Sequence, residues 1–139
     1  MKTKFILAGL AGGVFYFFAG WLVYGILLMN FYESNTIHYD GLNKEMPVMW
    51  MLALSNLLMG YFLAYIFDRW AKISTPLDGF SAGLIIGLFI SLIYDLSFLS
   101  MMNLMSSTMA LVDIIVSGLV IGLVGAVVGW VLGYGKKND

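Results

Sequence analysis

The sequence has no cysteine and only one histidine among its 139 residues. The absence of cysteine excludes disulfide bonds, thiol redox chemistry and metal sites built on cysteine. Charged residues are also scarce, at 11% of the chain, and the net charge is −1. Because the few lysines and arginines form no basic stripe, nothing in the sequence indicates a nucleic-acid partner.

Recognisable catalytic motifs are missing as well. The chain contains no G-x-S-x-G, no H-E-x-x-H, no P-loop and no glycine-rich dinucleotide turn after a strand. His38 lies with Glu33, Asp40 and Glu45 in the longest polar stretch, but the spacing matches no zinc pattern. The sequence therefore predicts a protein that is not an enzyme, with no cofactor and no metal site.

Hydrophobic residues make up 61% of the chain, and the mean hydropathy is +0.92, which is typical of a membrane protein. About 20 apolar residues cross a bilayer core, and four segments reach that length. The first is too long for the apolar part of a signal peptide and is interpreted as a retained span. The predicted fold class is all-α: a polytopic membrane protein with a four-transmembrane-helix antiparallel bundle. Its single domain, 1–139, has spans at 5–31, 48–67, 79–104 and 109–134, an outer loop at 33–46 and an inner loop at 68–78.

Basic residues flank the spans unequally. Cytoplasmic loops carry the excess of lysine and arginine, so one side of the four-span topology is predicted to be cytoplasmic. That side carries Lys2, Lys4, Arg69, Lys72, Lys136 and Lys137, whereas Lys44 is the only basic residue on the other. Both termini are therefore expected in the cytoplasm.

Small residues recur at every fourth position in the last two spans. In the third span they lead to a carboxylate, and in the fourth they follow one, with only Ile121 interrupting the line. The members are Gly79, Gly83, Gly87, Ser91 and Asp95 in one span, and Asp113, Ser117, Gly125, Gly129 and Gly133 in the other. Small-xxx-small faces let helix backbones approach closely. We expect the two faces to pack antiparallel, with Gly83 near Gly129 and Gly87 near Gly125.

Asp95 is the most unusual polar residue because no lysine, arginine or histidine lies inside any span. A carboxyl group at that depth can be protonated, can face a hydrated pocket or can bind a cation. Asn56 is expected at the same depth on the second span. A candidate polar or ion-binding cluster in the outer half of the membrane therefore comprises Asp95, Asp113, Asn56, Tyr24, Ser117 and Ser91.

Two functions remain open at this point. If Asp95 only holds helices together through hydrogen bonds, the chain is a non-enzymatic accessory or assembly partner in the lipid bilayer, in a homo-oligomer or a larger membrane complex. Alternatively, Asp95 titrates or binds an ion, and the chain is a proton- or cation-coupled small-solute transporter or channel. Under either function, the first span is predicted to be one helix with the polar residue Tyr24 in the outer half of the membrane.

The segment Trp21-Leu22-Val23-Tyr24-Gly25, the four-span length and the glycine-rich last helix resemble a domain-of-unknown-function family of small four-helix bacterial membrane proteins. Members of that family have an aromatic W-Y-x-P-like element at this place. This chain departs from it, since Leu22 and Val23 separate the tryptophan from the tyrosine and no proline follows Gly25. The resemblance implies a bacterial inner-membrane location and implies no activity.

Overall fold

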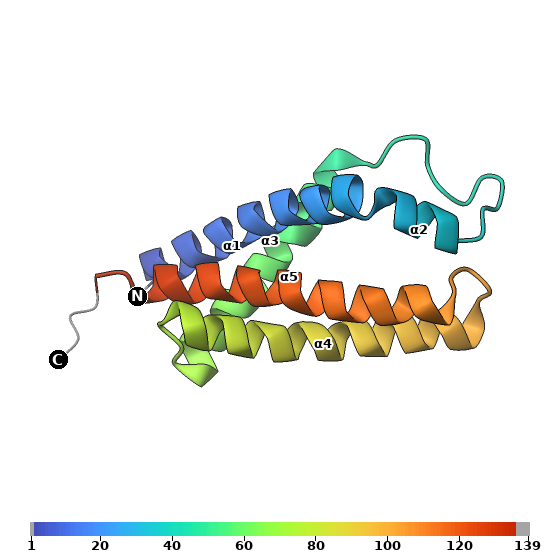
Figure 1. Cartoon of the computed structure of the whole chain (residues 1–139). Coiled ribbons are helices and arrows are strands. Elements are labelled where there is room, and N and C mark those ends of the chain that lie inside the picture. Colours follow the sequence, from blue (N-terminus) through green and yellow to red (C-terminus); the bar gives the residue numbers. More distant parts are fainter. Residues whose placement is uncertain (1, 136–139) are drawn as a thin grey trace.

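The structure is a computed structural model that describes residues 2–135 (Figure 1). Its elements, in order, are α1 (Lys2–Leu22), the π-helical segment η1 (Val23–Leu27), α2 (Met29–Asn35), α3 (Met49–Ile66), the π-helical segment η2 (Phe67–Ala71), α4 (Pro76–Met101) and α5 (Ser107–Gly133). Lys136 and Lys137, which entered the predicted topology, lie outside the described residues.

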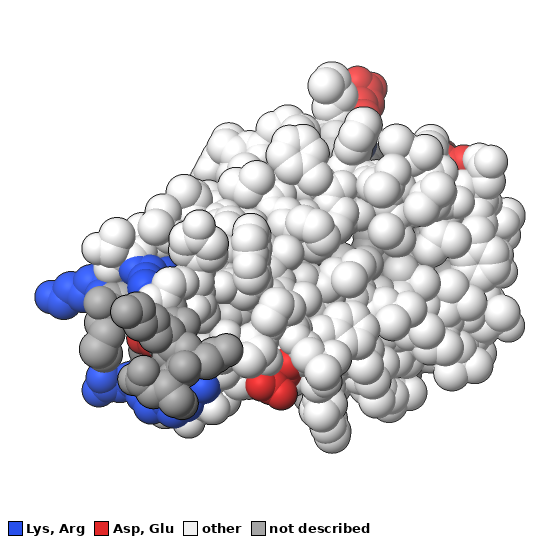
Figure 2. Space-filling model, turned by 60° about the vertical axis from the view of Figure 1, so that its left-hand side comes forward, with Lys and Arg blue, Asp and Glu red and all other residues white. Residues whose placement is uncertain are grey.

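Four helical stretches are long and apolar enough to cross a membrane. They are Lys2–Leu27, Met49–Ala71, Pro76–Met101 and Ser107–Gly133. The predicted class, a multi-pass all-α membrane protein with four long helices, is confirmed. The charged residues accord with it: Figure 2 shows lysine and arginine gathered at one end of the molecule beside a wide uncharged face.

The third membrane helix begins earlier than the predicted 79–104. Thr75 is the N-cap residue of α4, and its side-chain oxygen accepts a hydrogen bond from the backbone N–H of Asp78 at 3.2 Å. Pro76 fits the first helical position because its missing N–H would have no partner there. The cap and the proline thus shorten the inner loop, which was predicted to be 68–78.

The first span is not the single helix predicted over 5–31. It widens into η1 and breaks at Leu28, which has φ −110° and ψ 6°, before α2 continues to Asn35. Gly25 lies inside η1, where the lack of a side chain lowers helix stability. A π segment adds a residue to the turn and changes the direction in which later side chains point.

The helices pack in the order α3, α1, α5, α4. The main contacts join α1 to α3, α1 to α5, and α4 to α5, whereas α3 and α4 hardly touch although they are adjacent in the chain. Figure 1 shows α4 and α5 side by side along their length, with α3 crossing behind α1. The buried apolar core lies among α1, α3, η2 and α5, and contains Ala8, Leu63, Ala64, Phe67, Ile121, Val124, Val128 and Leu132.

Helices α4 and α5 meet through backbone atoms. A Cβ added at Gly79 would overlap the carbonyl of Gly125, and one added at Gly83 would lie 3.1 Å from the Gly125 Cα. Close packing of these spans is confirmed, but the predicted register is wrong by one turn. Gly83 faces Gly125 instead of Gly129, and Gly87 faces Ile121 and Gly118 instead of Gly125.

The first turn of α4 explains the shifted register. Gly129 lies against the carbonyl of Thr75 and Gly133 against the carbonyl of Ser74, so both glycines pack on the residues that lead into the helix. One end of the α5 glycine face is thus occupied by the connection before α4. Each residue of the α4 face is therefore opposite an α5 residue one turn away from the predicted one, and Asp95 lies opposite Asp113.

A second glycine contact, between α1 and α3, was not predicted. Gly60 on α3 lies against Gly9 and Gly13 on α1, because a Cβ there would overlap the Gly13 N–H and the Gly9 carbonyl. The spacing of Gly9 and Gly13 is a G-x-x-x-G motif in an apolar helix, which is a recognised signal for close helix packing. The sequence therefore held the signal for this contact.

Replacing Gly125 by alanine should destabilise the protein by about 2 kcal/mol, because the new methyl group would overlap the Gly79 carbonyl. Unfolding in detergent, followed by circular dichroism, measures the effect. The matched control is Gly20→Ala in α1, where no neighbouring atom lies within 4 Å of the added Cβ. Equal stability of the two variants would contradict the glycine interface.

Candidate functional site

Asp95 and Asp113 face each other across the α4–α5 interface, close enough for the charge of one carboxyl group to act on the other. Each lies about 9 Å from the nearby end of its helix at the usual rise per residue. Asp95 is only 7% exposed, and its Oδ2 is buried without a hydrogen-bond partner among residues 2–135. We refer to Asp95 and Asp113 as the carboxyl pair.

Three hydroxyl groups surround the Asp113 side of the pair. The Tyr32 hydroxyl donates to Asp113 Oδ1 at 2.5 Å, and the Ser117 hydroxyl donates to Asp113 Oδ2 at 3.4 Å. The Tyr24 hydroxyl lies 2.6 Å from the Ser117 oxygen. Because a serine hydroxyl has one proton, and Ser117 gives it to Asp113, Tyr24 is the donor in that bond. Tyr24 and Ser117 thus donate in series toward Asp113, and Tyr32 donates to Asp113 separately. We refer to these three residues as the hydroxyl chain.

Tyr32 was missed by the sequence analysis, which ended the first span before it. Tyr32 lies eight positions after Tyr24. In an unbroken α-helix the two side chains would point in directions that differ by about 80°. The extra residue in η1 and the break at Leu28 bring the two rings together instead, edge to face with centroids 5.3 Å apart. Tyr32 could have been suspected only as a hydroxyl at the end of a span.

Burial raises the pKa of the Tyr32 hydroxyl, and the neighbouring Asp113 carboxylate raises it further. Tyr32 therefore remains a neutral phenol, able to donate its proton in a hydrogen bond, throughout the physiological pH range.

Short segments outside the long helices hold Tyr32 over the pair. Thr36, which follows α2, forms an antiparallel bridge with Met105 in the connection between α4 and α5. The N–H of Ile37 donates to the carbonyl of Leu104 at 2.8 Å, and the N–H of Ser106 donates to the carbonyl of Asn35 at 3.3 Å. Since these bonds tie α2 to the start of α5, they fix the hydroxyl chain in place.

The predicted cluster is thus only partly assembled. Asp95, Asp113, Tyr24 and Ser117 come together, and Ser91 is buried one turn away from Asp95 on the same face of α4. Asn56 does not join them, although it is buried and its depth was expected to match that of Asp95. It lies on α3, which hardly touches α4, and its side-chain amide donates to the carbonyl of Leu52 in its own helix at 2.6 Å.

Asn56 instead lines a cleft of about 640 Å³ between α1 and α3. Tyr24 lines the same cleft, together with Tyr16, Trp21 and Ser55. The cleft therefore reaches Tyr24, whereas neither residue of the carboxyl pair lines it.

The fold and the cluster define a small polytopic helical membrane protein with a carboxyl pair buried between two helices. Comparison with models of protein families, with curated proteins and with solved structures gives no match.

Replacing Tyr32 by phenylalanine should lower the free energy of unfolding by about 2 kcal/mol, since it removes a hydrogen bond to a carboxylate and leaves Asp113 Oδ1 without its donor. Denaturant titration in detergent measures the change. Tyr94→Phe is the control, because Tyr94 is 63% exposed on α4. A Tyr32→Phe variant as stable as Tyr94→Phe would show that the bond to Asp113 contributes nothing.

Proposed function

We propose that the chain is a non-enzymatic membrane protein in which the carboxyl pair binds and releases one proton as part of proton-coupled transport. The observation that carries the proposal is the buried, unpartnered oxygen of Asp95 directly opposite a second carboxyl group. Two ionised carboxylates that face each other would repel strongly in an apolar environment. A shared proton removes the repulsion and gives the Asp95 side of the pair a hydrogen bond.

The hydroxyl chain supports an unequal division of roles within the pair. Asp113 accepts hydrogen bonds from Tyr32 and Ser117, so both of its oxygens already have a donor. Within residues 2–135, Asp95 Oδ2 receives no such donor, and Asp95 is more deeply buried than Asp113, so it is suited to carry the proton. Asp95 is accordingly the group that takes up and releases the proton, and Asp113 is its anionic partner.

A proton fits the pair better than a divalent cation does. Magnesium and calcium require six or more oxygen ligands, including waters. In the part of the chain that the structure describes, no group of three or more His, Cys, Asp or Glu side chains could hold a metal ion. The Tyr32 and Ser117 hydroxyls also direct their protons toward Asp113, so they present hydrogen, not oxygen lone pairs, to the pair.

An accessory or assembly role is the second candidate, and the arrangement of α3 and α4 favours it. The two helices hardly touch, so α4 packs mainly on α5 and the bundle is open between α3 and α4. A helix of another subunit, or of a second copy, would extend the packing order there. In this role the carboxyl pair is a fixed hydrogen bond that holds the register of α4 and α5.

The Asp95→Asn variant separates the two roles, because asparagine keeps hydrogen bonding and removes titration. We expect it to fold with nearly unchanged stability and to lose proton flux in liposomes, measured with an enclosed pH-sensitive dye. Infrared titration should show a protonated carboxyl band near pH 7 in the parent protein, and that band should be missing in the variant.

Asp40→Asn, in an exposed loop, is the control for the loss of one acidic group and should change neither signal. Full proton flux in Asp95→Asn would refute proton-coupled transport and favour the accessory role. Ionised Asp95 and Asp113 in the parent protein at pH 7 would refute the shared proton.

We further propose that both termini face the cytoplasm of a bacterial cell and that the chain lies in the inner membrane, in line with the basic flanks and the family resemblance. Because the chain lacks cysteine, single cysteines can be introduced without interference. A cysteine at the exposed position Asp40 should react with an impermeant maleimide in whole cells, and one at Lys72 only after lysis. The opposite pattern would invert the topology.

A further inference from the structure

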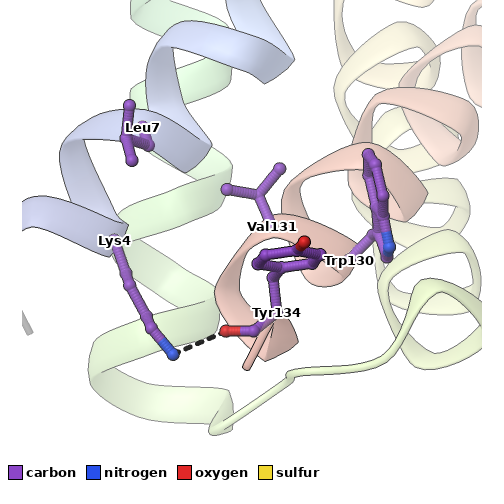
Figure 3. A pocket seen from close by; sticks show the side chains of 5 residues that line it. All are labelled: Lys4, Leu7, Trp130, Val131 and Tyr134. Carbon is purple, nitrogen blue, oxygen red and sulfur yellow. Dashed lines mark hydrogen bonds between the residues drawn. The ribbon is translucent and has the colours of Figure 1, made fainter. Parts of the chain in front are cut away.

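A groove between the start of α1 and the end of α5 has no part in the site described above. Its volume is about 440 Å³, within the range of pockets that hold small ligands. Figure 3 shows the residues that line it: Lys4 and Leu7 from α1, and Trp130, Val131 and Tyr134 from α5. Because these helices are membrane spans, the groove opens toward the lipid at the end of the bundle where lysine and arginine gather (Figure 2).

Lys4 places a positive charge at this groove in a fixed position. Its ammonium group donates a hydrogen bond to the backbone carbonyl of Tyr134 at 2.7 Å. An ammonium group has three N–H donors, so a group that donates one of them to Tyr134 can also donate to an anionic oxygen. Among residues 2–135, no acidic residue lines this groove, whereas the neighbouring groove on the other side of α1 combines Lys2 and Arg69 with Asp68. The Lys4 groove is therefore the better anion site of the two.

The walls of the groove match the other parts of a phospholipid. Leu7 and Val131 are apolar and lie on the membrane side of Lys4, where an acyl chain would run. Trp130 and Tyr134 are 56% and 71% exposed and stack edge to face. Such half-exposed aromatic side chains are typical of the interface between acyl chains and headgroups.

We propose that this groove binds one anionic phospholipid, with the headgroup phosphate at Lys4 and an acyl chain along Leu7 and Val131. Basic pockets between membrane helices recognise anionic headgroups in this way. A zwitterionic phospholipid offers the same acyl chains, but its own cationic group competes for the phosphate. The charge of Lys4 therefore sets the preference, which does not depend on the carboxyl pair.

Quenching of Trp130 fluorescence by brominated lipids tests the proposal. Trp21, Trp50 and Trp70 are replaced by phenylalanine, and the protein is reconstituted in vesicles of unlabelled phosphatidylcholine. A small, equal fraction of brominated phosphatidylglycerol or brominated phosphatidylcholine is then added. We expect about a fivefold preference of the groove for phosphatidylglycerol, the factor expected for one basic residue at a membrane surface.

Three variants decide whether the preference belongs to this groove. Lys4→Gln should abolish it and Lys4→Arg should retain it. Lys72→Gln, which removes the same charge at the same end of the bundle but outside the groove, should leave it unchanged. Equal quenching by both lipids in the parent protein, an undiminished preference in Lys4→Gln, or an equal loss in Lys72→Gln would each overturn the proposal.

Discussion

The backbone contact between α4 and α5 is the constraint on which the rest of the structure depends. Because Gly79 and Gly125 leave no room for a Cβ, the two helices are held at a separation that side chains would otherwise prevent. The same contact fixes the register, and the register places Asp95 against Asp113. Two carboxyl groups meet there because the residues that lead into α4 pack against Gly129 and Gly133 and so set this alignment of the two glycine faces.

The two ends of the bundle are stabilised by different interactions. Near the chain termini, the side chains of Phe67, Leu63 and Val128 fill a dry core among α1, α3 and α5. At the other end, η1 and α2 form hydrogen bonds with α5 through Tyr24 and Tyr32. The N-terminal segment takes part at both ends, because η1 turns the residues after α1 away from the direction that a straight helix would follow. The π segment η1 thus separates α1, which packs in the apolar core, from α2, which forms hydrogen bonds with α5.

The sequence predicts the features that depend on composition and on the spacing of residues along one helix. It does not predict the features that depend on which helices become neighbours. Four spans follow from hydropathy, and two glycine faces follow from the spacing of four. The register does not, because a four-residue repeat offers nearly the same fit after a shift of one turn. The register is set by the backbone of Ser74 and Thr75, which packs against Gly133 and Gly129. The glycine repeat does not encode that contact. Asn56 illustrates the same point, since depth along a helix says nothing about which helix lies opposite.

Charge at the carboxyl pair and the conformation of α2 are linked by this arrangement. If the shared proton leaves, Asp95 and Asp113 repel, but α4 and α5 cannot separate without losing the backbone contact between their glycine faces. The side chains of the pair can move more easily, and Asp113 already has two donors, Tyr32 and Ser117. Tyr32 and its helix are held there by individual hydrogen bonds, each contributing about 1 kcal/mol. We infer that the loop end, and not the glycine interface, yields when the pair becomes fully ionised, and hydrogen exchange in α2 that is the same above and below the titration of the pair would contradict this link.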